Sequence, residues 1–555
     1  MSASSKKKLR REQNAAELTE KQLTEQKEAK KLKAQSTAFV AVIAVIVCIA
    51  LAVGLSNLYS RSGISERNTV AATVGERELS TAELSYYYID AINTTYNNWY
   101  NSYGDYTSTY VQMLMGLDMT QPLSDQPYMG DESKTWADYF VEIAVENAKS
   151  VYAMYDLAVA DGRTLTEEEE ESIDNNIATM EMYGTVYGYP DIESYLKANY
   201  GNGATEGDYR EYLKLTTLAA GYYADYADSL VYDDAALRAY EEGREKEYNS
   251  YTFASYYLAA NRFLEGGTTD DEGNTTYSDE ETAASIAAAK KAAESLSDVK
   301  TVEELETAAA ALPVNADTTV SVSKNTDLLY SDITSTLQSW VSDESRKAGD
   351  VAVIPNESTS TGEDGEEKTT TFGYYVVIFQ DSTDNAFPLV NVRHILSSFE
   401  GGTTDETTGL TTYSDTEKKA ALDALTAVEQ TWKDGEATED SFAALVADNS
   451  DDTGSLTTGG LYEDVYPGQM VTAFNDWCFD ASRKPGDTDI VETEYGYHFM
   501  YFVGNSDQTY RDHMLTADKH AEDLDSWYTG IVDAATASAE DVSGLNLDLI
   551  MTPAA

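Results

Sequence analysis

The chain has 555 residues, of which 42% are apolar, and a formal net charge of −59. This length is too great for one hydrophobic core, so we expect about three or four domains, and the apolar fraction excludes a disordered chain. Residues 1–35 contain ten basic and five acidic side chains, whereas the remainder contains 28 basic and 92 acidic ones. Such an acidic body repels phosphate groups and disfavours nucleic acid as a partner. It suits basic clients, a cation-rich cell wall, or solubility alone.

An uncharged apolar segment follows the basic residues. It reads AFVAVIAVIVCIALAVGL over residues 38–55, and a helix of 18 residues is about 27 Å long, close to the thickness of the bilayer core. The positive-inside rule places the basic tail, residues 1–35, in the cytoplasm and the bulk of the chain outside. We interpret residues 36–56 as an uncleaved single-pass signal anchor in the cell membrane. A cleaved signal peptide is the alternative, and Val45-Ile46-Val47 before Cys48 fits a lipoprotein signal poorly.

The two cysteines, Cys48 and Cys478, are far apart in sequence and do not form a disulfide framework. An extracellular protein without disulfides is compatible with a Gram-positive type of envelope. Cys478 lies between Trp477 and Phe479, which favours a small buried side chain over a nucleophile.

Residues 64–247 are predicted to form a helical domain. Ser80 and Glu83 have the spacing of a capping box, as do Thr166 and Glu169, so a helix is expected to begin after each serine or threonine. Apolar residues recur with helical spacing over residues 136–160. Further helices are expected at about residues 190–199, 206–229 and 233–246, and a short strand at residues 69–75.

An internal repeat follows the helical domain. The sequence LEGGTT at 264–269 recurs as FEGGTT at 399–404, and TYSD at 276–279 recurs at 412–415. Matching segments keep their order with offsets between 123 and 138 residues, which predicts two copies of one small α+β domain at residues 248–384 and 388–505. The acidic loops lack the spacing of a calcium loop, so no metal is expected. Residues 506–555 are predicted to add a helix at about 513–536 that packs back on the helical domain.

Five short motifs in the second copy resemble the parvulin family in order and spacing. They are VRHIL at 392–396, NSDD at 449–452, GG at 459–460, GQMVTAF at 468–474 and GYH at 496–498. The whole extracellular body resembles the PrsA/SurA-type foldases, with residues 64–247 as the SurA-N-like chaperone domain. This resemblance implies a multidomain fold: an all-α chaperone-like domain plus two α+β parvulin-like modules, preceded by one transmembrane helix.

The resemblance implies a peptidyl-prolyl cis/trans isomerase and chaperone that assists the folding of exported proteins. Its partners would be unfolded or exported polypeptides with X-Pro bonds and, through the N-terminal helix, the membrane. It would need no cofactor. A non-catalytic holdase that only grips peptides is the alternative, and a surface adhesin is a third reading. The oligomeric state stays open.

The family motifs imply the site residues. His394 and His498 would be paired imidazoles on adjacent strands, and Asp452 would lie near the substrate carbonyl, with Asp451 as an alternative one residue away. Substrate-binding roles fall to Met470, Phe474, Leu461 and Gln469. Met470 and Phe474 are four residues apart, which places them on one helix face.

Isomerisation requires no metal or covalent step. The barrier of about 18–20 kcal/mol is lowered when the amide is desolvated and fixed hydrogen bonds meet the twisted state.

The two copies differ at these positions. In the first copy we expect Tyr375 in place of His498, and Tyr256 or Ala259 in place of His394. Ile333 and Leu337 would replace Met470 and Phe474. The first copy is therefore predicted to be a degenerate module that keeps its core and lacks the polar site. The second copy also departs from many parvulins, because LYE at 461–463 stands where they have DLG.

Overall fold

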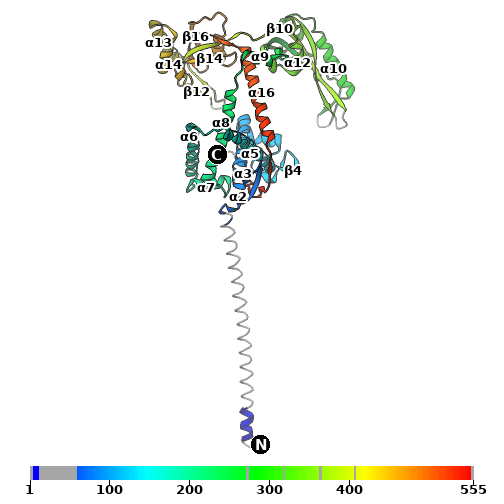
Figure 1. Cartoon of the computed structure of the whole chain (residues 1–555). Helices are drawn as coiled ribbons and strands as arrows, with labels where there is room; N and C mark the ends of the chain where they lie inside the picture. Colours follow the sequence, from blue (N-terminus) through cyan, green and yellow to red (C-terminus); the bar gives the residue numbers. More distant parts are fainter. Residues whose placement is uncertain are drawn as a thin grey trace. The chain divides into compact units, whose positions relative to one another are not determined.

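The structure is a computed structural model that describes residues 4–11, 59, 61–270, 274–316, 319–361, 366–405 and 408–551. The chain divides into two compact units, residues 1–230 with 523–555, and residues 231–522 (Figure 1). No helix among the described residues is long and apolar enough to cross a membrane. The anchor predicted at residues 36–56 lies outside the described residues, so it stays a prediction.

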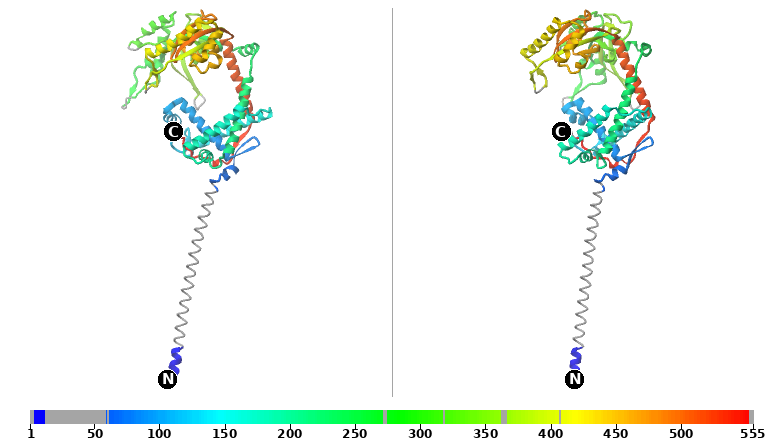
Figure 2. Two further views of the ribbon diagram at one scale, coloured as in Figure 1. Left: turned by 90° about the vertical axis from the view of Figure 1, so that its left-hand side faces the viewer. Right: turned by 60° about the vertical axis from the view of Figure 1, so that its left-hand side comes forward.

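The first unit is mainly helical, and its three longest helices pack on one another. These are α3 (Thr81–Tyr103), α5 (Trp136–Ala160) and α8 (Glu206–Ser229), and Figure 2 shows them, in blue to green, gathered together. Their shared core includes Leu84, Trp136 and Phe140, each at most 1% exposed. The shorter helices of this unit are α2 (Ile64–Asn68), α4 (Thr107–Met115), α6 (Glu167–Val186) and α7 (Ile192–Tyr200).

Both predicted capping boxes are present. Glu83 N–H donates to Ser80 Oγ over 3.2 Å and Ser80 N–H donates to Glu83 Oε2 over 2.7 Å, so each residue satisfies an otherwise unpaired N–H group at the start of α3. Thr166 and Glu169 make the same pair of bonds at the start of α6.

A small antiparallel sheet completes the first unit. It contains β17 (Ala537–Ala539), β1 (Val70–Val74) and β2 (Arg77–Ser80), in that order. Leu545 and Met551, which follow β17, are buried in the helical core. The last part of the chain therefore contributes a strand and apolar side chains to this unit. A separate hairpin joins β3 (Pro127–Tyr128) to β4 (Asp131–Thr135).

The second unit contains two four-stranded antiparallel sheets with the same topology. Their strand orders are β8-β5-β10-β9 and β14-β11-β16-β15. The first sheet consists of β5 (Ser250–Ala259), β8 (Ser323–Leu329), β9 (Val351–Thr361) and β10 (Glu367–Thr383). The second consists of β11 (Pro388–Ser398), β14 (Leu461–Val465), β15 (Thr488–Glu492) and β16 (Gly496–Thr509).

Helices cover both faces of each sheet. In the first sheet α10 (Asp279–Glu294) and α11 (Val302–Ala310) cover one face and α12 (Ser335–Val341) the other. In the second, α13 (Asp415–Asp434) and α14 (Glu439–Asn449) cover one face, as Figure 1 shows, and α15 (Thr472–Cys478) covers the other. The unit also contains α9 (Asp234–Glu241) and the first half of α16 (Tyr510–Ala534).

The repeated glycine and threonine motif forms a small hairpin in both copies. The hairpins pair β6 (Thr268–Thr269) with β7 (Thr275–Thr276) and β12 (Thr403–Thr404) with β13 (Thr411–Thr412). Gly402 has a φ of 82°, and its N–H donates to Glu417 Oε1 over 2.9 Å, while Glu417 also closes the capping box of α13. The motif therefore fastens each hairpin to the helix that follows it.

Arg511, at the start of α16, is a buried junction of the second unit. Its side chain is ion-paired with Glu241 of α9 and donates to Asn249 Oδ1 over 2.8 Å and to the carbonyl oxygens of Asp384 and Glu245 over 2.7 Å each. Both Arg511 and Glu241 are 8% exposed. One guanidinium thus joins α9, the start of β5 and the link between the two sheets.

We expect Arg511→Met to destabilise the second unit by about 3 kcal/mol, because it removes these bonds and leaves the Glu241 carboxylate buried with Arg238 alone. Scanning calorimetry of the full chain measures the effect. Lys419→Met, which breaks an exposed pair with Asp423, is the matched control and is expected to change stability by less than about 1 kcal/mol. Equal shifts for the two variants would show that Arg511 has no special structural role.

Candidate active site

The two faces of the second sheet have different side chains because successive residues of a strand point to opposite sides. Ile395 and Phe499 pack with α13 and α14, whereas Val392 and Met500 pack with α15. His394 and His498 are two residues from Val392 and Met500, so both imidazoles lie on the α15 face.

The register of β11 and β16 brings these imidazoles together. His394 lies opposite Met500 and His498 lies opposite Leu396 in the antiparallel pair, so the two histidines are diagonal neighbours within side-chain reach. Their Nδ1 atoms are 3.0 Å apart, and His394 and His498 are 3% and 5% exposed.

A chain of hydrogen bonds extends from both ends of the imidazole pair. His394 Nε2 lies 2.9 Å from Asp452 Oδ2, and His498 Nε2 lies 2.8 Å from Thr493 Oγ1. An ionised Asp452 can only accept, so His394 carries its proton on Nε2 and accepts at Nδ1. His498 then donates from Nδ1 and accepts the Thr493 hydroxyl proton at Nε2. Every donor in this row of hydrogen bonds, from Thr493 to Asp452, has an acceptor when both imidazoles are neutral.

The environment favours those protonation states. Burial lowers the pKa of His394 although the hydrogen bond to Asp452 acts in the opposite direction. Burial, with a smaller contribution from His394, lowers the pKa of His498 to about 4. Burial would raise the pKa of Asp452, but hydrogen bonds from Ser455, His394 and Tyr462 outweigh it and lower the pKa to about 2. The site therefore holds two neutral imidazoles and one carboxylate near pH 7.

Apolar side chains cover the imidazoles. The Phe474 ring is nearly perpendicular to both, with ring centroids 5.5 Å from His394 and 5.4 Å from His498. Met470, half-buried, and Phe474, 3% exposed, belong to one apolar cluster with Tyr462. The structure thus brings five of the predicted residues together: His394, Asp452, His498, Met470 and Phe474.

Leu461 and Gln469 have other surroundings. Leu461 lies opposite Arg393 and precedes Tyr462 on β14, and strand alternation turns it away from the face that Tyr462 shares with Phe474. Gln469 is exposed, and its amide oxygen accepts from Tyr466 N–H over 3.2 Å in the turn before α15. Their substrate-binding roles remain predictions.

Two further placements concern Asp451 and Cys478. Asp452, not Asp451, contacts His394, because Asp451 accepts the backbone N–H of Ser398 over 2.8 Å. Cys478 is 1% exposed, and burial raises the pKa of its thiol to about 12. It is a core residue, not a nucleophile.

Three hydroxyl groups complete the site, and the sequence patterns did not predict them. Ser455 and Tyr462 both donate to Asp452 Oδ2, Tyr462 over 3.0 Å, and Thr493 donates to His498. Thr493 lies in the turn before β16, three residues before the GYH motif. This position close to His498 is the sequence feature that could have pointed to Thr493 as a site residue. Tyr462 belongs to the segment LYE at 461–463, which stands where many parvulins have DLG. A tyrosine hydroxyl therefore lies beside the Asp452 carboxylate at a position where those proteins have a leucine side chain.

The register of the first sheet corrects one expectation. Tyr375 lies opposite Tyr257 and Val377 lies opposite Ser255, so Ser255 occupies the position of His394, and neither Tyr256 nor Ala259 does. The reason is the four-residue helical turn Ala260–Phe263 after β5, which has no counterpart after β11 and changes the offset between the copies at that point.

We expect nitrogen-15 NMR of the imidazoles to find both site histidines neutral at pH 6, with the proton of His394 on Nε2 and that of His498 on Nδ1. The chain has four histidines, so His394→Gln and His498→Gln assign the signals. His498 is expected to titrate near pH 4. A charged imidazole at pH 6, or the opposite tautomers, would contradict the assigned hydrogen-bond chain.

Residues 394–504 match the family model described as Rotamase, PPIC-type PPIASE domain. Foldase protein PrsA 1 of Listeria innocua is 33% identical over 67 residues, which are 12% of this chain and 23% of that protein. The chain thus matches less than a quarter of the length of this curated relative.

Two crystal structures of PrsA proteins are similar at low sequence identity. For the peptidylprolyl isomerase PrsA of Bacillus anthracis the identity is 18% and the TM-score 0.17, over 27% of this chain and 59% of that one. For PrsA of Bacillus subtilis the identity is 14% and the TM-score 0.25, over 72% of this chain and 86% of that one. With the sequence match as the evidence, residues 394–504 form a PPIC-type peptidyl-prolyl isomerase domain of the parvulin class, in a chain that is similar to the PrsA foldases.

Proposed function

We propose that the chain is an extracytoplasmic foldase that catalyses cis/trans isomerisation of X-Pro bonds in exported polypeptides and holds them while they fold. One observation carries the proposal: two buried, neutral imidazoles are hydrogen-bonded to each other, and His394 is also hydrogen-bonded to the ionised Asp452. Phe474 packs against both imidazoles and shares an apolar cluster with Met470. This arrangement combines an apolar surface for a proline ring with a fixed charge.

The apolar cluster acts first in this mechanism. Rotation about the X-Pro bond passes through a twisted state in which the amide loses its conjugation, against about 18–20 kcal/mol. Met470 and Phe474 receive the proline ring and remove water from the amide, which favours the less polar twisted state over the planar one. No bond is formed or broken with the protein.

Asp452 acts on the carbonyl side. In the planar amide, conjugation places negative charge on the carbonyl oxygen, and twisting withdraws part of it. A carboxylate beside that oxygen therefore repels the planar state more than the twisted state, which lowers the barrier. His394, Ser455 and Tyr462 hold Asp452 in place and keep it ionised, so we assign the two imidazoles a positioning role.

We expect Met470→Ala with His394→Ala to lower isomerisation by at least about 100-fold, because the proline surface and the support of Asp452 are both lost. The full chain is assayed on an X-Pro peptide and on suppression of client aggregation, which is expected to persist. The matched control is Ile333→Ala with Ser255→Ala at the corresponding positions of the first sheet, which should leave the isomerisation rate unchanged. Loss of both activities in a mutant that stays folded would show that they share one site.

A non-catalytic holdase is the second candidate function. The observation that favours it is the first sheet, which has the same strand order and an apolar cluster of Phe253, Leu337 and Val377 on the corresponding face. Ser255 and Tyr375 stand there in place of the imidazoles. We infer that this module is a degenerate parvulin that binds peptides without isomerising them. A wild-type chain that suppresses aggregation without accelerating proline exchange would favour the holdase for the whole protein.

The extracytoplasmic location rests on the basic tail at residues 1–35 and the uncharged segment at 38–55. We expect a cysteine introduced as Glu76→Cys to react with a membrane-impermeant thiol reagent on intact cells, and one introduced as Lys8→Cys to be protected. The unmodified chain, whose own cysteines are Cys48 and the buried Cys478, is the control for background labelling. Release of the protein in soluble form would show that the apolar segment is cleaved, and labelling of Lys8→Cys would reverse the topology.

A further inference from the structure

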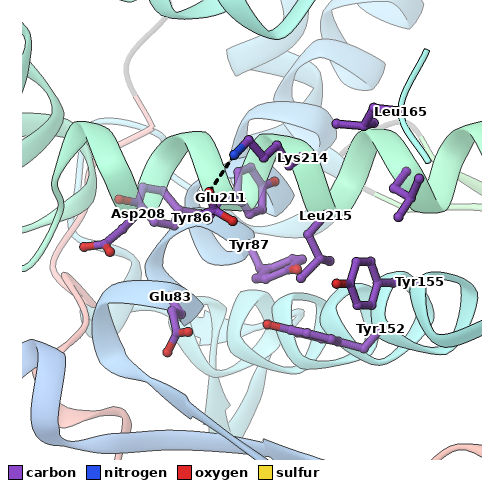
Figure 3. A pocket seen from close by; sticks show the side chains of 12 residues that line it. Glu83, Tyr86, Tyr87, Tyr152, Tyr155, Leu165, Asp208, Glu211, Lys214 and Leu215 are labelled. Atoms are coloured by element: carbon purple, nitrogen blue, oxygen red, sulfur yellow. Dashed lines mark hydrogen bonds and ion pairs between the residues drawn. The ribbon is translucent and has the colours of Figure 1, made fainter. Parts of the chain in front are cut away.

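The helical unit contains a pocket between α3, α5 and α8, separate from the isomerase site. Its volume is about 450 Å³, within the range of small-molecule sites. The lining is rich in tyrosine, including Tyr87 from α3 and Tyr152 and Tyr155 from α5, and carries the carboxylates of Glu83, Asp208 and Glu211 (Figure 3).

The hydroxyl of Tyr87, a nearly buried residue, opens into this pocket. Tyr87 is 4% exposed, and among the described residues its hydroxyl makes no hydrogen bond. Figure 3 shows this hydroxyl directed toward Tyr155, whose own hydroxyl is turned back toward it. The hydroxyl oxygen is not among the fully buried unpaired atoms of the described residues, so it is accessible from the pocket, where a ligand can supply the hydrogen-bond partner that the protein does not.

The charge of the pocket is negative. Burial raises the pKa of Tyr87, and it raises the pKa of Tyr152 to about 12, so the tyrosines are neutral and the charge comes from the three carboxylates. Lys214 pairs with Glu211 over 2.8 Å and offsets one of them. The lining then offers acceptor oxygens and aromatic faces, with a net negative charge.

Glu83 and Asp208 already have a structural role, which has to be separated from ligand binding. Glu83 closes the capping box of α3 through Oε2, and Asp208 accepts the Thr205 hydroxyl through Oδ2 over 2.7 Å. Each cap uses one oxygen of the carboxylate, so the other oxygen and the charge remain available to the pocket.

We propose that this pocket binds a basic side chain, arginine in preference to lysine, of an extended client polypeptide. A guanidinium has five N–H donors for these acceptors and stacks on aromatic rings. The chain itself provides an example at the same helix, where Arg77 Cζ lies 5.2 Å from the centre of the Tyr152 ring and the guanidinium pairs with Asp156. The site is independent of proline and therefore goes beyond the isomerase function.

The test measures binding of a proline-free peptide, acetyl-Gly-Ser-Ala-Arg-Ala-Ser-Gly-amide, to the full-length protein in detergent. Its partner peptide has citrulline in place of arginine, which keeps the shape and removes the charge. We expect the arginine peptide to bind roughly 5- to 30-fold more tightly. Equal affinities of the arginine and citrulline peptides would overturn the proposal. If N-acetyl-arginine amide bound as tightly as the arginine peptide, the assignment of the ligand as a polypeptide would be overturned.

Variants locate the site. Glu83→Gln with Asp208→Asn removes two charges and keeps side chains that can still cap their helices, so we expect affinity for the arginine peptide to fall to the citrulline level. The control, Glu168→Gln with Glu171→Gln, removes two exposed charges of α6 and should change affinity less than 2-fold. An equal loss in the control would assign the effect to the general field of the protein and overturn the site.

Tyr87→Phe deletes only the hydroxyl that opens into the pocket and provides a second test if the double variant is poorly folded by circular dichroism. It is expected to weaken arginine-peptide binding and leave the folded state intact. Unchanged binding in Tyr87→Phe would overturn the role of this pocket. Proline isomerisation by all these variants should equal that of the wild type, so a failure of this proposal is distinguishable from a failure of the isomerase proposal.

Discussion

The antiparallel register of β11 and β16 is the constraint on which the isomerase site depends. Residues two apart share a face, so placing Val392 and Met500 in the core under α15 also places His394 and His498 there. A slip of β16 by one residue would turn His498 away from His394 toward α13 and α14 and move Phe499 out of its cluster. The apolar burial of both faces thus fixes the register, and the register fixes the distance between the two imidazoles.

The same constraint explains how the first sheet has the same topology with other residues at the two imidazole positions. Its register is kept by Phe253 and Val377 on the face of α12 and by Ala254, Val376 and Ile378 on the other. Ser255 and Tyr375 stand at the positions that correspond to His394 and His498. Their hydroxyl groups can donate or accept a hydrogen bond, so they do not require a partner in a particular protonation state. A hydrogen-bonded imidazole pair, in contrast, requires both members and a fixed acceptor at its end, so the loss of one member removes the reason to keep the other.

The sequence predicted the parts of the site that local patterns determine. His394, His498, Asp452, Met470 and Phe474 fall within short motifs, and the capping boxes of α3 and α6 need only a spacing of three. Thr493, Ser455 and Tyr462 escaped because their partners are set by strand register and by the loop after α14, which no local pattern specifies. The counterpart of His394 was misplaced for a related reason. In the first copy the turn at 260–263 adds residues between the strand and the glycine motif. When the two copies are aligned on the glycine motif, every strand residue before the turn is therefore matched to the wrong residue of the second copy.

Five of the 97 acidic residues have a local structural role that changes how their carboxylates are interpreted. Glu83, Asp138, Glu169, Glu281 and Glu417 each occupy the third position of a capped helix, where a carboxylate satisfies backbone N–H groups and faces the positive end of the helix. A cap engages one oxygen and leaves the charge in place. Where such a helix start borders a cavity, as α3 does, the folding requirement itself supplies a fixed anionic wall. An acid with a structural role can for that reason still select a cationic ligand, and separating the two roles requires substitutions that keep the cap while removing the charge.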